Sequence, residues 1–202
     1  MIFYDGGGAP NARRVRIYLS EKGLDIPMKT IDIMKGEHKT DEYKKISPLS
    51  QVPALELDDG TFITESIAIC RYFEALNPDP NLMGTDPNEI AIIEMWQRRL
   101  ELLLMMPIAS VFRHGHPAMA HLENQVIEWS EANKPRILSF YNWLDKQLKG
   151  KDFICLNRYT LADVTALTCF EFAKWPKINI PEDCLNLKKY YQMLSDRPSA
   201  KA

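Results

Sequence analysis

One segment, Lys44–Phe73, constrains the fold of this chain more than any other. Its middle, Gln51–Leu57, has the pattern of a short apolar strand that is entered through Pro53. The turn Asp58–Gly60 follows, and Asp-Gly between apolar runs is a strong β-hairpin signal. A second short strand, Thr61–Ile63, completes the expected hairpin.

The hairpin leads directly into Thr64-Glu65-Ser66, which precedes an apolar-periodic run and marks the start of a helix. Proline cannot donate to a sheet ladder, so Pro53 indicates an edge strand or a cis peptide that turns the backbone of Val52 outward. An outward amide and carbonyl can pair with a ligand main chain. The helix N-terminus can hold a carboxylate, and Glu65 can meet an ammonium group. These residues alone also fit a purely structural hairpin followed by a helix.

Composition and charge exclude several classes of function. The chain has 202 residues, enough for one large or two small domains. Its net charge of −2 gives no electrostatic reason to expect nucleic acid or an anionic membrane as a partner. No apolar run approaches the ~18 residues of a membrane span. The four cysteines lack zinc-ligand spacing, and no signal peptide pattern is present. We therefore expect a cytoplasmic protein with reduced thiols.

The rest of the first half alternates strands and helices. Met1–Tyr4 and Met28–Ile33 are expected strands, and a helix capped by Asn11 runs to Lys22 before Gly23. A short helix is expected around Asp41–Lys45. The arginines of the first helix, Arg13, Arg14 and Arg16, form a basic face that suits surface ion pairs or a subunit contact.

Beyond a proline-rich stretch the pattern becomes helical. We expect a first domain at residues 1–77, a linker at 78–87 and an all-helical domain at 88–202. Thr160-Leu161-Ala162-Asp163 forms a capping box ahead of an apolar helix. The expected helices are Glu89–Met106, Leu122–Lys149, Val164–Phe172 and Leu185–Leu194. We expect a break or kink at Pro107, followed by a ragged helix end over Val111–Pro117. The second helix should bend or break at Pro135.

This organisation resembles the cytosolic glutathione transferase superfamily, in which a thioredoxin-like α/β domain precedes an all-α domain. The segment NARRVRIYLSEKGL (Asn11–Leu24) resembles that family's first helix. SQVPAL resembles its cis-proline motif and TES its γ-glutamate-binding motif, while the capping box at Thr160 resembles that of its core helix. The resemblance covers essentially the whole chain.

The resemblance implies a glutathione site in the first domain, with glutathione as a co-substrate and no tightly bound cofactor. Val52 would bind the cysteinyl backbone of glutathione, and Glu65 and Ser66 its γ-glutamyl end. The other implied glutathione contacts are Ser50, Gln51, Pro53, His38 and Lys39. For His38 and Lys39, ordinary solvated loop charge is the alternative.

Glutathione chemistry requires a thiol that is ionised near neutral pH, whereas a free thiol has a pKa of ~8.5. Ala9 stands at the family's usual serine position, and Asn11 at that of its cysteine-type members. An asparagine there resembles the bacterial nu class, whose activity includes disulfide reduction with two glutathiones, although Ala9 replaces that class's threonine. We expect Asn11 to donate its side-chain amide to sulfur, with simple helix capping as the alternative. Tyr4 is an alternative donor.

The same resemblance implies a small hydrophobic electrophile, a detoxifying role and a homodimer. Its electrophile site would involve Ala9, Met105, Ile108, Phe112 and Arg113, although packing also explains apolar helix positions.

No metal site is expected, because the rings of His114 and His116 point apart on a helix end and no carboxylate is spaced to join them or His121.

Conjugation of glutathione to an electrophile is the expected activity. A glutathione-dependent disulfide reductase and a non-catalytic binding module of the same fold are the alternatives.

Overall fold

The computed structural model describes all residues, 1–202. The chain forms two compact units, one of residues 1–83 with 198–202 and the other of residues 84–197. The tail 198–202, which follows the helical half in sequence, thus belongs to the first unit. None of the helices combines the length and the apolar character that a membrane span requires.

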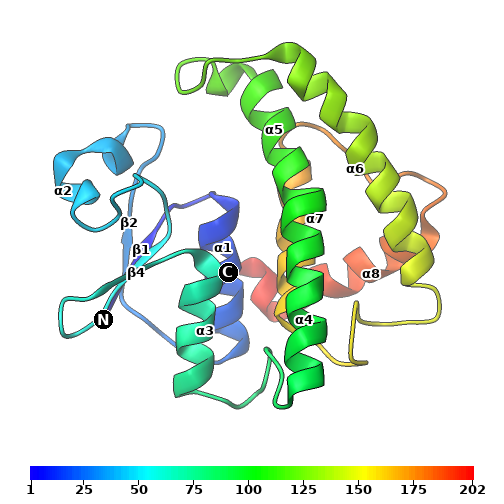
Figure 1. Ribbon diagram of the computed structural model, residues 1–202, viewed down its shortest axis with the longest axis horizontal. Coiled ribbons are helices and arrows are strands. Elements are labelled where there is room, and N and C mark those ends of the chain that lie inside the picture. The colour runs from blue at the N-terminus through cyan, green and yellow to red at the C-terminus, as the bar shows by residue number, and fades with distance from the viewer. The chain divides into compact units, whose positions relative to one another are not determined.

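The first unit is a four-stranded mixed sheet with helices on its faces (Figure 1). The strand order is β2-β1-β3-β4, in which β1 is parallel to β2 and antiparallel to β3. Helices α1 and α3 contact each other on one face, and α2 lies on the other side (Figure 1). The elements are β1 Ile2–Asp5, α1 Pro10–Glu21, β2 Met28–Thr30, a 3₁₀ turn Glu37–Lys39, α2 Asp41–Lys44, β3 Ala54–Glu56, β4 Phe62–Thr64 and α3 Ser66–Leu76. The expected thioredoxin-like fold is confirmed.

The hairpin and the helix predicted from Lys44–Phe73 are both present, as β3, β4 and α3. Strand β1 pairs with β3 in a register that joins Phe3 to Leu55, and both side chains are fully buried. Ile69 and Phe73 of α3 are buried as well, as their helical spacing predicts.

Two expected element boundaries in this unit were wrong. Helix α1 begins at Pro10, with Ala9 as the N-cap, so Asn11 is its second residue and does not cap it. Proline suits the first helical position, because the missing N–H has no partner in the helix there. Strand β2 ends at Thr30, short of Ile33, because the Asp32 side chain accepts from the Lys35 amide and turns the chain.

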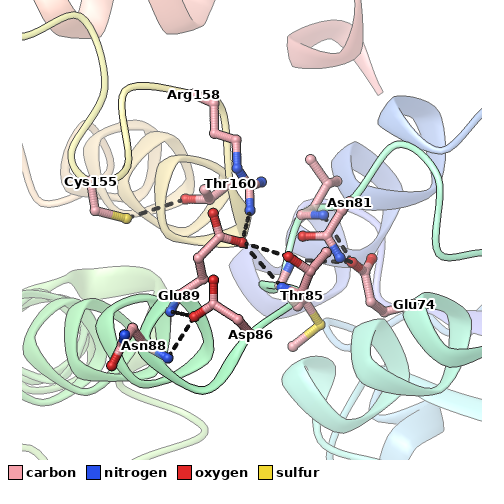
Figure 2. A network of polar contacts seen from close by, with 11 residues as sticks. Glu74, Asn81, Thr85, Asp86, Asn88, Glu89, Cys155, Arg158 and Thr160 are labelled. Atoms are coloured by element: carbon pink, nitrogen blue, oxygen red, sulfur yellow. Dashed lines mark hydrogen bonds and ion pairs between the residues drawn. The ribbon is translucent and has the colours of Figure 1, made fainter.

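The segment after α3 is held by Glu74. One carboxylate oxygen, Oε1, accepts from Asn81 Nδ2 at 2.9 Å and from the amides of Leu82 and Met83 at 2.9 and 3.1 Å (Figure 2). The other oxygen pairs with Lys22, whose side chain is fully buried. The proline-rich stretch is therefore fixed to the first unit by hydrogen bonds.

The second unit consists of helices: α4 Pro87–Leu100, a π-helical turn Glu101–Met105, α5 Met106–Gly115, α6 Ile127–Gln147, α7 Leu161–Ala173 and α8 Leu185–Ser195, with a short 3₁₀ turn Pro117–Met119. The ragged end expected at Val111–Pro117 is wrong, because α5 continues to Gly115. Pro107 lies in the first turn of α5, directly after the π-helical turn, where its missing N–H breaks no α-helical bond. Helix α6 begins at Ile127, later than the expected Leu122, and includes Pro135 without ending there.

Helix α7 is the core of the second unit, and its capping box is present as expected. The carboxylate of Asp163, fully buried, accepts four hydrogen bonds. Their donors are the Thr160 amide at 2.8 Å, the Thr160 hydroxyl at 2.9 Å, the Ile154 amide at 3.0 Å and the Tyr190 hydroxyl at 2.7 Å. Burial raises the pKa of the Asp163 carboxyl, and these hydrogen bonds oppose that rise. The side chain ties the loop before α7 to both α7 and α8.

Helix α4 is capped in a different setting, at the surface. Asp86 accepts from the amides of Asn88 and Glu89 at 2.8 and 3.0 Å (Figure 2). Glu89 in turn accepts from the amide of Thr85 at 3.1 Å and pairs with Arg158 at 2.8 Å. The hydrogen bond from the Thr85 amide, followed by that from Arg158, lowers the pKa of the Glu89 carboxyl.

Candidate active site

A groove in the first unit lies where α1 and α3 begin. It contains about 350 Å³ of space, part of it open to solvent. The lining residues come from three parts of the chain: Asn11 at the start of α1, Ser47, Pro48, Leu49, Gln51, Val52 and Pro53 in the loop before β3, and Thr64, Glu65 and Ser66 before and at the start of α3. Two helix N-termini and an irregular loop thus face one small volume.

The backbone of Val52 lies outside the sheet. The β1–β3 ladder ends at Ala54, and the Val52–Pro53 peptide is cis, one of the two alternatives that the sequence left open. Gly6 packs against Val52 so closely that an added Cβ would lie 2.4 Å from Val52 Cγ2. Sequence reasoning missed Gly6, because the run of three glycines does not reveal which one touches a neighbour.

Ser66 begins α3, and its side chain is connected to a buried arginine. Arg14 Nη1 donates to Ser66 Oγ at 2.7 Å, and Arg14 is only 1% exposed. Because the serine oxygen accepts from Arg14, its own hydrogen is available to donate into the groove. A buried positive charge and the positive end of a helix therefore lie behind this wall of the groove. Glu65, the preceding residue, is exposed and has a positive φ of 68°.

The expectation of a basic surface face on α1 was therefore wrong for Arg14. Its place four residues before the buried Tyr18 puts it on the apolar side of the helix, a signal that the sequence contains. Arg16 forms an ion pair with Asp5 and donates to the Gly7 carbonyl at 2.9 Å. Arg13 donates to the carbonyl of Ala200 in the C-terminal tail at 2.8 Å.

Two hydrogen bonds to Gln51 restrain the loop before β3. The Tyr43 hydroxyl donates to the Gln51 carbonyl at 2.9 Å, and the Gln51 amide donates to Ser47 Oγ at 3.2 Å. Burial raises the pKa of Tyr43 to about 12, so its hydroxyl keeps its proton at neutral pH. Sequence reasoning missed both residues: Tyr43 lies in α2, outside the loop, and Ser47 lies in the loop ahead of the Ser50–Leu55 motif.

The two candidate sulfur donors differ in position. Asn11 is exposed and lines the groove. The Tyr4 hydroxyl donates to Glu56 Oε2 at 2.7 Å, and Tyr4 is 6% exposed and absent from the groove wall. The hydrogen bond to Glu56, together with burial, raises the pKa of Tyr4 to about 12. Ala9 is half-buried at the N-cap of α1.

Three of the expected glutathione contacts do not line the groove. His38 and Lys39 lie in the 3₁₀ turn Glu37–Lys39, half-buried and exposed respectively. Burial, with the neighbouring Lys39 charge, lowers the pKa of His38. Ser50 has a positive φ of 56°, and the residues on both sides of it form the groove wall.

The expected electrophile residues divide into core and surface. Ile108 is fully buried and Met105 is 7% exposed, so the side chain of Ile108 is not available to a ligand in this structure. Phe112 is half-buried, with its ring centroid 5.5 Å from Phe172 and 5.2 Å from Trp175. Arg113 is exposed and lies 3.5 Å from the Glu123 carboxylate.

Two histidines of the second unit hold a turn. His114 Nδ1 accepts from the Val126 amide and His116 Nδ1 from the Ala118 amide, both at 3.2 Å. No three His, Cys, Asp or Glu side chains in the structure are grouped in a way that could hold a metal ion.

Comparison with known proteins identifies the family. Residues 9–76 match the family model for the glutathione S-transferase N-terminal domain, and residues 104–198 match that for the C-terminal domain. Glutathione S-transferase 2 of Saccharomyces cerevisiae is 35% identical over 205 residues, which cover 100% of this chain and 88% of the yeast protein. The chain belongs to the glutathione transferase family.

Solved structures support the same fold for this glutathione transferase. The crystal structure of Gtt2 from Saccharomyces cerevisiae superposes with a TM-score of 0.93 at 35% identity and covers 100% of this chain and 99% of its own. A class Gtt2 glutathione S-transferase of Vibrio parahaemolyticus gives a TM-score of 0.88 at 31% identity, covering 100% of this chain and 96% of its own. The expected superfamily and enzyme type are confirmed.

Proposed function

We propose that this glutathione transferase binds glutathione in the groove of its first unit and joins the thiolate of glutathione to small hydrophobic electrophiles. One observation carries the proposal: the Val52 backbone, the Glu65–Ser66 helix start and Asn11 line a single groove. Glutathione carries two main-chain-like amides, a free amino acid end and a thiol between them. Such a ligand requires an extended main chain to pair with, a site for its carboxylate and a hydrogen-bond donor to its sulfur.

Each part of the groove suits one part of glutathione. The main chain of Val52, outside the sheet ladder, pairs with the cysteinyl backbone as an added strand would. The Ser66 hydroxyl and the N-terminus of α3 bind the γ-glutamyl carboxylate, with the Arg14 charge behind them. Glu65 is exposed at the same wall and binds the γ-glutamyl ammonium.

The reaction then requires the thiol proton to leave before the carbon–sulfur bond forms. The proton passes to solvent, the thiolate attacks the electrophilic carbon, and a leaving group departs with its electron pair where the substrate has one. Asn11 stabilises the thiolate through its side-chain amide, helped by the positive end of α1. The position of Asn11 in the groove, and the hydrogen bond of Tyr4 to Glu56, favour Asn11 over Tyr4.

Replacing Asn11 with alanine is expected to raise the pKa of the bound glutathione thiol by about one to two pH units. The variant loses a hydrogen bond to a charged group, which contributes about 1.5–3 kcal/mol. The measurement is the ultraviolet absorbance of the thiolate in the complex, titrated over pH.

Asn88→Ala provides the control, because Pro87-Asn88 begins α4 just as Pro10-Asn11 begins α1. That variant loses an asparagine at the same helix position that does not line the groove, and its thiolate titration should match that of the parent. An unaltered titration in Asn11→Ala would remove Asn11 from the mechanism.

The second unit provides apolar surface for the electrophile. Phe112, Phe172 and Trp175 form a cluster of aromatic rings, and Trp175 is 43% exposed. Exposed aromatic faces favour flat, apolar substrates through stacking and edge contacts. We therefore assign glutathione binding to the first unit and electrophile preference to this aromatic cluster of the second.

Disulfide reduction with two glutathiones is the second candidate activity. All four cysteines are free and buried, and none lines the groove, so both thiols would have to come from glutathione. Burial raises the pKa of Cys70 to about 12, which makes it a poor nucleophile. Free cysteines also suit the reducing cytoplasm that we expect for this enzyme.

One set of measurements separates these activities. Isothermal calorimetry tests glutathione binding, and turnover is then compared for an aryl halide and for a small disulfide. We expect binding and faster turnover of the aryl halide. Faster disulfide turnover would support the reductase, and binding without turnover of either would leave only a binding role.

A homodimer is also part of the proposal. Helix α4 and the turn after it expose large apolar side chains, among them Met95 at 39%, Leu102 at 56% and Leu103 at 49%. Met106, the first residue of α5, is 57% exposed. Burial of these side chains against a second copy would stabilise association. Sedimentation equilibrium should give twice the mass of the chain, and a monomer would contradict this.

A further inference from the structure

Tyr43 is the one side chain that holds the carbonyl of Gln51 from below the groove. It comes from α2, lies 3% exposed and packs in a small cluster with Tyr4, Ile31 and Ala54. Val52 packs against the same cluster with its partly buried side chain. Beside these apolar contacts, the Tyr43 hydroxyl makes a hydrogen bond of 2.9 Å to the Gln51 carbonyl oxygen.

The geometry of the peptide unit extends the effect of this hydrogen bond to Val52. The Gln51 carbonyl and the Val52 N–H belong to the same peptide plane, which is trans. In a trans peptide the C=O and N–H bonds point in opposite directions. Because the carbonyl points to the buried Tyr43 hydroxyl, the Val52 N–H points the other way, and Val52 lines the groove.

The direction of the bond is unambiguous. A carbonyl oxygen can only accept, and a tyrosine hydroxyl of high pKa remains a donor across the physiological range. Ser47 restrains the preceding peptide, Ser50–Gln51, because its Oγ accepts a hydrogen bond from the Gln51 amide at 3.2 Å. Both peptide planes that flank Gln51 are thereby restrained from the protein side.

We propose that Tyr43 is a positioning residue for glutathione, whose hydroxyl fixes the Gln51–Val52 peptide so that the Val52 N–H is presented to the cysteinyl carbonyl of the ligand. This inference rests on the proposed function and adds to it a residue that does not touch the ligand. A preorganised amide binds without first giving up its rotational freedom, so loss of the restraint weakens binding and leaves the chemistry of the bound thiol alone.

The test is Tyr43→Phe, which removes the hydroxyl and keeps the ring in its apolar cluster. Calorimetry with glutathione should show a dissociation constant raised about 3- to 10-fold, the range for loss of one hydrogen bond. The KM for glutathione should rise by the same factor, while kcat at saturating glutathione stays within about 2-fold, because the sulfur and its donors are unchanged.

The control is Tyr141→Phe, since the Tyr141 hydroxyl is buried in the second unit without a hydrogen-bond partner. It should leave glutathione affinity unchanged. A second measurement reports on Val52 directly. In an NMR titration of ¹⁵N-labelled protein, the Val52 amide resonance should shift on adding glutathione. At the same fraction of protein bound to glutathione, the shift should be smaller in Tyr43→Phe.

The outcomes separate the two claims. If the parent enzyme binds glutathione and Tyr43→Phe binds it equally well with the same Val52 shift, the positioning role is overturned and the proposed function stands. If the parent enzyme itself fails to bind glutathione, the proposed function is overturned. If Tyr43→Phe binds glutathione more weakly, keeps the kcat of the parent and shows a smaller Val52 amide shift, both the positioning role and the proposed function are supported.

Discussion

Replacing Asp163 with alanine is expected to lower the free energy of unfolding by about 3–5 kcal/mol, among the largest effects of any single substitution in this chain. Its carboxylate is fully buried and accepts from Thr160, Ile154 and Tyr190. The variant leaves four buried donors without their acceptor, and each such donor costs about 1–3 kcal/mol unless the structure relaxes around it. The loop before α7 and the contact with α8 both lose their common anchor.

Urea denaturation followed by tryptophan fluorescence gives this free energy. Asp86→Ala is the matched control, because Asp86 also accepts two amides at a helix start but is exposed. Water replaces the lost carboxylate there, so the cost should be only about 1 kcal/mol. Equal losses in the two variants would show that burial does not amplify the Asp163 interaction.

Replacing Ser66 with alanine is expected to raise the dissociation constant for glutathione about 10- to 100-fold. In the proposed complex its hydroxyl donates to the γ-glutamyl carboxylate, and a hydrogen bond to a charged group contributes about 1.5–3 kcal/mol. Arg14 donates to the same oxygen at 2.7 Å, which strengthens the serine as a donor and holds it in place. Calorimetry measures the affinity, and Ser66→Thr, which keeps a hydroxyl, should recover part of it.

Ser20→Ala serves as the control for Ser66→Ala. Ser20 is exposed on α1, and its replacement should change neither glutathione affinity nor stability. If Ser66→Ala folds and binds glutathione as tightly as the parent, the carboxylate site does not lie at the start of α3. The proposed orientation of glutathione in the groove would then be wrong.

Local signals predicted much of the fold. The Asp59-Gly60 turn, the apolar spacing of Ile69 and Phe73, and the Thr160–Asp163 capping box each depend on residues close in sequence, and each is present. The errors lie where a longer-range or alternative local pattern applies. Of the two alternatives at Pro135, a break is wrong, because α6 continues through it, and the break or kink expected at Pro107 corresponds to a π-helical turn that ends two residues earlier.

The groove could be predicted only in part. Val52, Glu65 and Ser66 lie within the stretch that the sequence singles out, and all three line the groove. The site residues Ser50, His38 and Lys39 do not line it, since loop conformation decides which side chains of an irregular segment face a cavity. Their contact with glutathione stays a prediction.

By itself, the sequence determined that Lys44–Phe73 forms a hairpin leading into a helix, because turn chemistry and apolar spacing act over a few residues. Only the tertiary structure decided what lies behind that segment. Arg14 reaches Ser66 across 52 positions, and Tyr43 reaches Gln51 from a separate helix. Such contacts depend on how α1, α2 and α3 pack around the sheet, and no local pattern encodes which polar atoms that packing brings within hydrogen-bond distance.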